Sequence, residues 1–384
     1  MRLWFSYISK KQKIWLFGTL GVMFCIVGFG IFLDSLEKTA PVGPFTIDMS
    51  IRDIAPHLKV TGKALARELK LPIDIKKAQP LKNFGVAQES LDHVVSHLLS
   101  HREKTVKYYL YGALVLGGLV FLVRLGCPDG SDVKQRHMWY PRTPYVVFLI
   151  ISVSACGFLM GKSPNPMEGV VKVFKSMVGL YPDPLLKGVA FLFFMLLAVA
   201  GNKMVCGWAC PFGSLQELIY SIPMFSQIKQ RRPPFIVTNI LRILIFLAMV
   251  LFLFGIVGGR KGTVIYHYIN PFNLFNLDFE TVSIVLTVAV TLFVSFVFYR
   301  PFCQLLCPFG LVSWIVERFS LCKVHIDMQK CTHCSACIRS CPLQAAQDRM
   351  KAKEFPADCF SCGRCLNVCP VDAIRYRSFL SKKA

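Results

Sequence analysis

Half of the sixteen cysteines in this 384-residue chain lie near its C-terminal end and follow one pattern, written twice. The pattern is C-x2-C-x2-C-x3-C with a proline directly after the fourth cysteine. Its two copies consist of Cys331, Cys334, Cys337 and Cys341, and of Cys359, Cys362, Cys365 and Cys369. This is the spacing of bacterial ferredoxins that hold two [4Fe–4S] clusters, and thiolates are the soft ligands that such clusters prefer. The segment is therefore expected to fold around two sulfur-lined cages.

The pattern also predicts which cysteines share a cluster. In two-cluster ferredoxins the fourth cysteine of each run ligates the other cluster. The expected ligand sets are Cys331, Cys334, Cys337 and Cys369 for the first cluster, and Cys359, Cys362, Cys365 and Cys341 for the second. Structural zinc is the alternative, but zinc ribbons use paired C-x2-C motifs without this triple run and its Cys-Pro ending. We therefore expect an α+β ferredoxin domain over residues 321–384, with strands near 324–327 and 373–377.

The rest of the chain has the composition of a membrane protein. The sequence is 54% hydrophobic and only 17% charged. A membrane-spanning helix needs about 20 apolar residues. Six stretches are long enough to be candidates: 13–33, 108–125, 144–161, 185–205, 236–257 and 282–299. The expected fold class is a mainly α polytopic membrane protein of about six transmembrane helices, followed by the ferredoxin domain. A cleaved signal peptide is the alternative for the first stretch, but no small-residue cleavage site follows it.

The formal net charge of +22 has a simple explanation in a membrane protein. Groups of Lys and Arg precede the first apolar stretch and separate the second from the third and the fourth from the fifth. This is the bias of cytoplasmic loops, and we prefer it to nucleic-acid binding. Six spans place both termini and the ferredoxin domain on the cytoplasmic side of a bacterial inner membrane. Thiols stay reduced there, which favours metal binding over disulfides.

Four regions follow from this pattern: an N-terminal transmembrane helix (1–33), a small extracytoplasmic helical domain (34–107), a helix bundle (108–320) and the ferredoxin domain (321–384). In the second region, Ser50 and Asp53 form a start similar to a capping box. His93, His97 and His101 share one face of an expected helix. Histidines four residues apart on a helix can bind a metal, but we favour an exposed amphipathic face without one.

The bundle contains an internal repeat. Residues 144–220 read as a span, an outer loop, a second span, C-x3-C-P-F-G and an amphipathic helix, and residues 236–316 read the same way. The cysteines of the two motifs are Cys206, Cys210, Cys303 and Cys307. Parallel repeats imply a pseudo-two-fold axis along the membrane normal. Both cysteine pairs are therefore expected at one depth, at the inner ends of the fourth and sixth spans.

Each C-x3-C-P motif places a proline where it suits the first turn of a new helix, with the preceding cysteine at the N-cap. A helix N-terminus favours negative charge, so a thiolate or an anionic cluster is stabilised there. Four cysteines are enough for a third iron–sulfur cluster or another soft metal, and we favour a redox or metal role. The alternative is a pair of small buried residues at a helix break, with Phe212 and Phe309 packed inward. The sequence leaves open whether all four cysteines share one centre.

Few charged residues fall within the expected spans. Arg242 lies near the start of the fifth span, and we expect its side chain to reach back to the inner interface; a quinone-binding role is the alternative. Glu217 follows the first cysteine motif. It could accept a proton near a quinone, but a single exposed glutamate at the interface is common. No histidine lies within an expected span, which argues against a bis-histidine haem in the membrane.

Taken together, the motifs resemble those of the NapH-type membrane ferredoxins, a group that includes the polyferredoxin halves of NosR-type and CcoG-type proteins. The resemblance covers residues 144–378 and includes all twelve patterned cysteines in order. For NapH-type members it implies electron transfer from the menaquinol or ubiquinol pool toward a partner oxidoreductase, through a ferredoxin subunit or a c-type cytochrome. For CcoG-type members it implies reduction of copper for oxidase assembly. Residues 1–142 are an addition to the NapH pattern.

The expected function is therefore membrane-bound iron–sulfur electron transfer between the quinone pool and a partner oxidoreductase, as a component of a quinol dehydrogenase. The expected cofactors are two [4Fe–4S] clusters and, at the membrane cysteines, a third iron–sulfur or other metal centre. Quinone is the expected substrate, and membrane lipid, ferredoxin or cytochrome subunits and a partner oxidoreductase are the expected partners, without nucleic acid. The alternative is a CcoG-like copper reductase that assists assembly of a respiratory enzyme. A mere membrane anchor leaves the membrane cysteine pairs unexplained.

Overall fold

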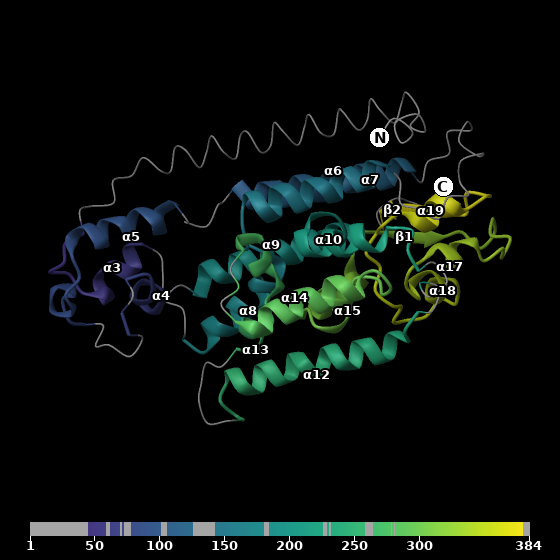
Figure 1. The fold of residues 1–384 in the computed structure, drawn as a ribbon. Helices are drawn as coiled ribbons and strands as arrows, with labels where there is room; N and C mark the ends of the chain where they lie inside the picture. Colours follow the sequence, from purple (N-terminus) through teal and green to yellow (C-terminus); the bar gives the residue numbers. More distant parts are fainter. Residues whose placement is uncertain are drawn as a thin grey trace.

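The computed structural model describes residues 45–378, except for 59–61, 70, 73–77, 101–105, 126–142, 180–183, 226–228, 230–231, 258–263, 278 and 280. Most of the regular structure in this part of the chain is helical. Figure 1 shows a small helical region at one end, a helix bundle in the middle and the cysteine-rich domain at the other end. The span expected over residues 13–33 lies outside the described residues.

The small helical region has an apolar core of its own. It consists of α3 (Ile51–His57), α4 (Gly62–Glu68), the 3-10 helix η1 (Leu81–Phe84) and α5 (Gln88–Ser100). The side chains of Ile51, Ile54, Leu65, Leu81 and Leu91 are fully buried in it. The hydroxyl of Ser50 donates to the carboxylate of Asp53 at 2.6 Å, and the Asp53 N–H donates to Ser50 Oγ at 3.3 Å. The predicted start of this helix is confirmed.

The histidine face of α5 is only partly described. His93 is exposed to solvent. The side chain of His97 and the whole of His101 lie outside the described residues. A metal site on this face therefore stays an untested alternative.

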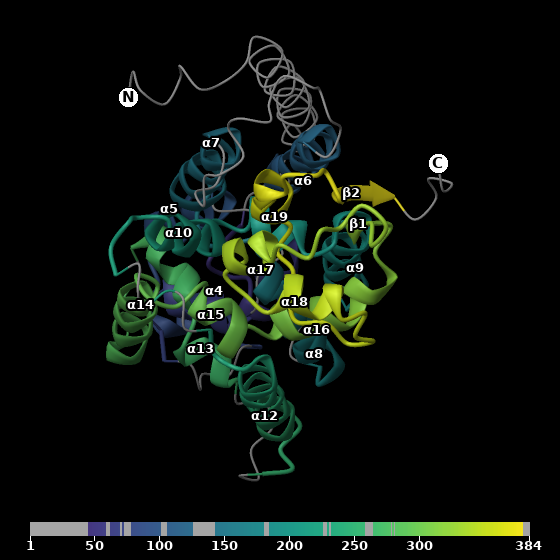
Figure 2. The same ribbon diagram turned by 90° about the vertical axis from the view of Figure 1, so that its right-hand side faces the viewer.

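The bundle is built from helices of unequal length. Its first half contains α6 (Val106–Leu125), α7 (Thr143–Ile151), the π-helix η3 (Ser152–Leu159), α8 (Pro166–Met177), α9 (Pro184–Gly201), the π-helix η4 (Val205–Ala209) and α10 (Pro211–Tyr220). Its second half contains α12 (Phe235–Leu253), α13 (Ile265–Tyr268), η5 (Pro271–Asn276), α14 (Val282–Val294), α15 (Pro301–Leu305), α16 (Pro308–Val316) and η6 (Glu317–Phe319). In Figures 1 and 2, α6 and α7 lie on one side of the bundle and α12 on the opposite side.

Two described helices are long and apolar enough to cross a membrane, namely residues 106–123 of α6 and the whole of α12. The expected spans at 144–161, 185–205 and 282–299 correspond to shorter apolar helices over 143–159, 188–201 and 282–294. The six full-length spans predicted from the sequence are therefore not confirmed. Helix α14 ends early because the chain turns at Ser295, and α9 ends where Asn202 takes a left-handed conformation with φ 55°.

The two cysteine motifs of the bundle have nearly the same backbone. Cys210 has φ −73° and ψ 115° and is the N-cap of α10, and Cys307 has φ −71° and ψ 120° and is the N-cap of α16. A proline occupies the first turn of each helix. This is the geometry that the sequence predicts for the repeat, because proline lacks the N–H that a first turn leaves unpaired.

The ferredoxin domain contains two antiparallel strands and three short helices. The strands are β1 (Cys322–Ile326) and β2 (Ile374–Ser378), which pair Cys322 with Ser378 and Val324 with Tyr376. The helices are α17 (Ala336–Ser340), α18 (Ala345–Met350) and α19 (Arg364–Val368). Both strands lie within two residues of the predicted positions.

The second cysteine run of this domain lies directly against the bundle. The Trp208 indole donates to the carbonyl of Ser361 at 3.0 Å, and the Tyr376 hydroxyl donates to the carbonyl of Gly201 at 2.7 Å. Gly207, inside the first C-x3-C-P motif, approaches the Phe360 carbonyl so closely that a Cβ atom would overlap it. The contact is therefore backbone against backbone and tolerates no side chain.

This close approach predicts that Gly207→Ala weakens the attachment of the ferredoxin domain. Overpacking of a tight contact costs roughly 1–3 kcal/mol, so the melting temperature should fall and the domain should become more sensitive to protease. Gly112→Ala in α6 is the matched control, because nothing lies within 4 Å of the added Cβ there. Equal stability of the two variants would contradict the prediction.

Candidate metal centres

The eight ferredoxin cysteines line two separate cavities. One cavity is lined by Cys331, Cys334, Cys337 and Cys369, and the other by Cys341, Cys359, Cys362 and Cys365. Each cavity thus gathers three cysteines of one run and the fourth cysteine of the other. Four thiols around one cavity are the donor set of a [4Fe–4S] cluster, so the residues present fit that group.

The loops around both cavities repeat the same backbone conformation. His333 and Ser361 hold equivalent places between the first and second cysteines of their runs, with φ 53° and 51°. Ser335 and Gly363 hold the next equivalent places, with φ 57° and 75°, and begin α17 and α19. Left-handed conformations are costly for residues other than glycine and gather at functional sites. Here they bend the chain around each cysteine-lined cavity.

The two cavities differ in exposure. Cys334 of the first is exposed and Cys331 is half-buried, whereas the second cavity is walled partly by Tyr299 of the bundle. Burial raises the pKa of the thiols of Cys337, Cys341, Cys359, Cys362 and Cys365. Because metal ligation requires thiolates, these thiols would release protons on binding iron.

The bundle cysteines Cys206, Cys210, Cys303 and Cys307, here called the four-cysteine site, are all buried. They belong to one buried core, in which the charge of Cys303 acts on both Cys206 and Cys210. The amide of Gln216 bridges the halves: its Nε2 lies 3.6 Å from Cys303 Sγ, and its Oε1 accepts from the Phe302 N–H at 3.0 Å. The repeat therefore brings the four cysteines into one interior region.

No set of three or more His, Cys, Asp or Glu side chains in the described part of the chain is arranged to hold a single metal ion. A single zinc ion needs thiolate sulfurs at about 2.3 Å from one point. The donor chemistry of the cysteine sites, four thiols per site, suits a larger sulfur-bridged cluster.

Two arginines from the second half of the bundle bind backbone carbonyls of the cysteine motifs, one arginine at each motif. Arg300 donates to the carbonyl of Cys206 and, at 3.0 Å, to that of Gly207. Arg242 donates to the carbonyl of Cys303 at 3.4 Å. The expectation that Arg242 reaches water at the inner interface is wrong, because its side chain is fully buried and pairs with the ferredoxin domain instead. It turns inward because a carboxylate of the ferredoxin domain is there to receive it.

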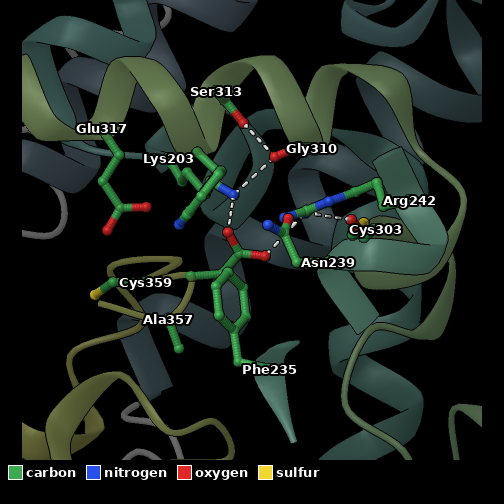
Figure 3. Close-up of polar contacts among 12 residues, drawn as sticks. Lys203, Phe235, Asn239, Arg242, Cys303, Gly310, Ser313, Glu317, Ala357 and Cys359 are labelled. Carbon is green, nitrogen blue, oxygen red and sulfur yellow. Dashed lines mark hydrogen bonds and ion pairs between the residues drawn. The ribbon is translucent and has the colours of Figure 1, made fainter. Parts of the chain in front are cut away.

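That carboxylate is Asp358, the residue before the second cysteine run. It accepts from Arg242 at 2.9 Å and pairs with Lys203, which also donates to the Gly310 carbonyl at 2.9 Å (Figure 3). Burial opposes ionisation of Asp358, but the charges of Arg242 and Lys203 outweigh it and hold its pKa below the ordinary value. Asp358 therefore ties both cysteine motifs of the bundle to the second ferredoxin cavity.

A second carboxylate, Glu217, has the same role on the other side. It accepts a hydrogen bond from Arg300 at 2.9 Å and forms an ion pair with Arg364 at 2.7 Å. Arg364 lies between Cys362 and Cys365 of the second run. The sequence suggested that Glu217 is an exposed interfacial residue, and this is wrong, because the side chain is fully buried.

The two carboxylates and their four partners form a buried charge network between bundle and ferredoxin domain. Its members are Lys203, Arg242, Arg300, Arg364, Asp358 and Glu217, and each is between 0% and 2% exposed. Four cations face two carboxylates, so within this described network two positive charges are in excess. Buried charge requires compensation. Thiolate-bound clusters beside the network would supply it.

Sequence reasoning missed Lys203, Arg300, Asp358 and Arg364. A signal was present for the first two, because Lys203 and Arg300 both stand three residues before the first cysteine of a C-x3-C-P motif. No local signal marks Asp358 or Arg364 as buried.

Glu317, the first residue of η6, is a further buried carboxyl. It accepts from Arg349 at 3.1 Å. Burial, helped by the charge of Asp358 and opposed by Lys203 and Arg349, raises the pKa of Glu317 to about 7. A carboxyl of this kind is partly protonated near neutral pH.

Comparisons with known proteins match the same segments. A model of the 4Fe-4S binding domain matches residues 186–233 and 281–326, which contain the two C-x3-C-P motifs. A model of the 4Fe-4S dicluster domain matches residues 323–370, which contain both ferredoxin runs. No solved structure matches the chain.

Several curated proteins are similar to part of the chain. It is 32% identical over 256 residues to the regulatory protein NosR of Stutzerimonas stutzeri, which covers 62% of this chain and 34% of that protein. It is 27% identical over 158 residues to the ferredoxin-type protein NapH of Escherichia coli, covering 40% and 52%. It is 29% identical over 150 residues to an uncharacterized protein of Methanocaldococcus jannaschii, covering 39% and 55%. The chain thus spans between about a third and just over half the length of these relatives.

The buried network predicts that Asp358→Asn is strongly destabilising. Removing one partner of a buried ion pair costs roughly 3–5 kcal/mol, because the cations left behind stay buried without compensation. Denaturant unfolding of the purified protein in detergent should show this loss. Glu354→Gln is the control, because Glu354 is 70% exposed in its pair with Arg318 and exposed pairs contribute about 0–1 kcal/mol. Similar losses in both variants would show that the network does not hold the domains together.

Proposed function

Because this chain belongs to the family of NapH/NosR-type polyferredoxins, we propose that it passes electrons between the quinone pool and a partner oxidoreductase through iron–sulfur clusters in a membrane. The observation that carries the proposal is the pair of cavities that each combine three cysteines of one run with the fourth cysteine of the other. The second cavity also contacts the first C-x3-C-P motif, where Phe360 meets Gly207. Iron–sulfur clusters supply one-electron transfer, and the protein supplies position and environment.

The cysteines have the following proposed roles. Cys331, Cys334, Cys337 and Cys369 hold the first [4Fe–4S] cluster, and Cys359, Cys362, Cys365 and Cys341 hold the second. The four-cysteine site holds a third iron–sulfur centre. The excess of buried positive charge beside it supports this role, since a cluster bound by four thiolates is anionic.

The geometry supports one order of transfer. Phe360, two residues before Cys362, contacts Gly207 of the first C-x3-C-P motif and lines the second cavity. The first cavity is lined only by residues of the ferredoxin domain, and its Cys334 is exposed. Electrons pass between the four-cysteine site and the first cluster by way of the second, and a soluble partner meets the first.

A membrane location is supported by the surface of the bundle. Large apolar side chains are exposed along α12 and α14, among them Ile236 (71%), Val282 (83%) and Phe293 (77%). Contiguous exposed apolar surface of this kind is unusual on a water-soluble monomer and marks contact with lipid or protein. We assign the bundle to the bacterial inner membrane, in multi-pass form, with the ferredoxin domain in the cytoplasm.

Iron counting tests the number of centres. Protein purified without oxygen should contain about twelve iron atoms per chain, since three [4Fe–4S] clusters are proposed. Both Cys362→Ala and Cys206→Ala should lower this to about eight, each removing a different EPR signal. Cys322→Ala is the control, because Cys322 is buried in the ferredoxin domain but belongs to none of the patterned motifs.

A wild-type count of about eight iron atoms per chain, unchanged in Cys206→Ala, would contradict the third centre and support only the two ferredoxin clusters. A purified protein free of iron would contradict the whole proposal.

The quinone link needs a separate test. In proteoliposomes, menaquinol or ubiquinol should bleach the visible absorbance of the clusters, and Cys206→Ala should slow this at least tenfold, since the four-cysteine site would be the entry point. A sealed sample given Cu(II) instead tests the copper-reductase alternative. Copper reduction without any response to quinol would replace the quinol dehydrogenase role by that alternative.

A further inference from the structure

Two tyrosine hydroxyls are buried in the bundle interior. Tyr111 of α6 is 0% exposed and Tyr266 of α13 is 1% exposed. Among the described residues, neither hydroxyl has a hydrogen-bond partner. Burying a polar group without a partner costs free energy, and a native structure that does so usually has a redox, catalytic or ligand-binding reason.

Both tyrosines belong to the same buried core as the four-cysteine site. The charges of Cys206 and Cys210 act on the Tyr111 hydroxyl, and the charge of Cys307 acts on the Tyr266 hydroxyl. Each tyrosine is thus associated with a different C-x3-C-P motif, and both come from helices outside the motifs.

The position of Tyr111 is fixed by packing. Its ring meets Phe194 edge to face at 5.2 Å between centroids, and Phe194 meets Phe309 of the second motif at 6.2 Å. The ring cannot move to find another partner without breaking this stack. The hydroxyl is thus held in place within the core.

A neighbouring tyrosine hydroxyl behaves differently. The Tyr145 hydroxyl donates to the Gly207 carbonyl at 3.2 Å and accepts from Arg300 at 3.1 Å. Tyr145 therefore serves the charge network, whereas the hydroxyls of Tyr111 and Tyr266 remain available as donors to a group between the cysteines.

We propose that the hydroxyls of Tyr111 and Tyr266 donate hydrogen bonds to sulfur atoms of the iron–sulfur centre at the four-cysteine site and thereby raise its reduction potential. The inference rests on the third centre of the proposed function. Hydrogen bonds to sulfur favour the reduced, more negative state of a cluster. They offset the burial of the site, which opposes added negative charge. Tyr111 and Tyr266 would act on the potential of the centre through these hydrogen bonds and would not be iron ligands.

EPR-monitored redox titration of the full chain, purified without oxygen, tests this. Tyr111→Phe and Tyr266→Phe should each keep the wild-type iron content and reduce the equilibrium constant for reduction of the third centre about tenfold, a negative shift of about 59 mV for one electron. The two ferredoxin clusters should keep their potentials. In D2O, deuterium ENDOR of the third centre should lose one exchangeable coupling in each variant.

Matched controls lie on the same helices. Tyr109→Phe in α6 and Tyr268→Phe in α13 change tyrosines that are 38% and 52% exposed, so neither should move any potential. A third centre whose potential and exchangeable couplings are unchanged in both buried-tyrosine variants would overturn the inference and leave the proposed function intact. A count of about eight iron atoms in wild type, unaffected by Cys206→Ala, would overturn the third centre and the tyrosine role together.

Discussion

The structure depends on two buried carboxylates that are each shared between two cations. Asp358 joins Lys203 to Arg242, and Glu217 joins Arg300 to Arg364. Removing such charges from water is costly, and apolar residues of similar size often stabilise a protein more. The charges therefore need a reason beyond holding two domains together. Their position, between the bundle cysteines and the second ferredoxin run, provides one, because the added electron of a redox centre is stabilised by nearby positive charge.

The same network links two of the three cysteine sites and leaves the third outside. Arg242 and Arg300 bind the carbonyls of Cys303 and Cys206, while Arg364 lies inside the second ferredoxin run. The first ferredoxin site has no part in the network and opens to solvent at Cys334. The chain thus has one site enclosed by the bundle, one at the junction and one at the surface. An electron-transfer protein that links a lipid-soluble donor to a soluble partner needs that order, since each step must cover a short distance.

The sequence predicted those features that short-range spacing determines. The cysteine runs, their Cys-Pro endings and the prolines after Cys210 and Cys307 each restrict the local backbone, and the structure has the predicted helix starts and strands there. It could not predict the charge network, because its members are far apart: Arg242 and Asp358 are separated by 116 residues. Position within an apolar run suggested that Arg242 reaches toward water. A buried partner from another domain reverses that preference, and no local pattern reports it.

The lengths of the spans were overestimated for a related reason. Hydropathy counts the apolar residues of 282–299 as one stretch, but only 282–294 are helical. The chain leaves the helix and reaches Arg300 in a left-handed conformation with φ 47°, directly before Pro301. Proline disfavours a helical conformation in the residue before it, and this turn delivers the Arg300 guanidinium to the carbonyl of Cys206. A continuous helix would carry Arg300 past the first motif. The short helix is therefore what allows one half of the repeat to cap the cysteines of the other.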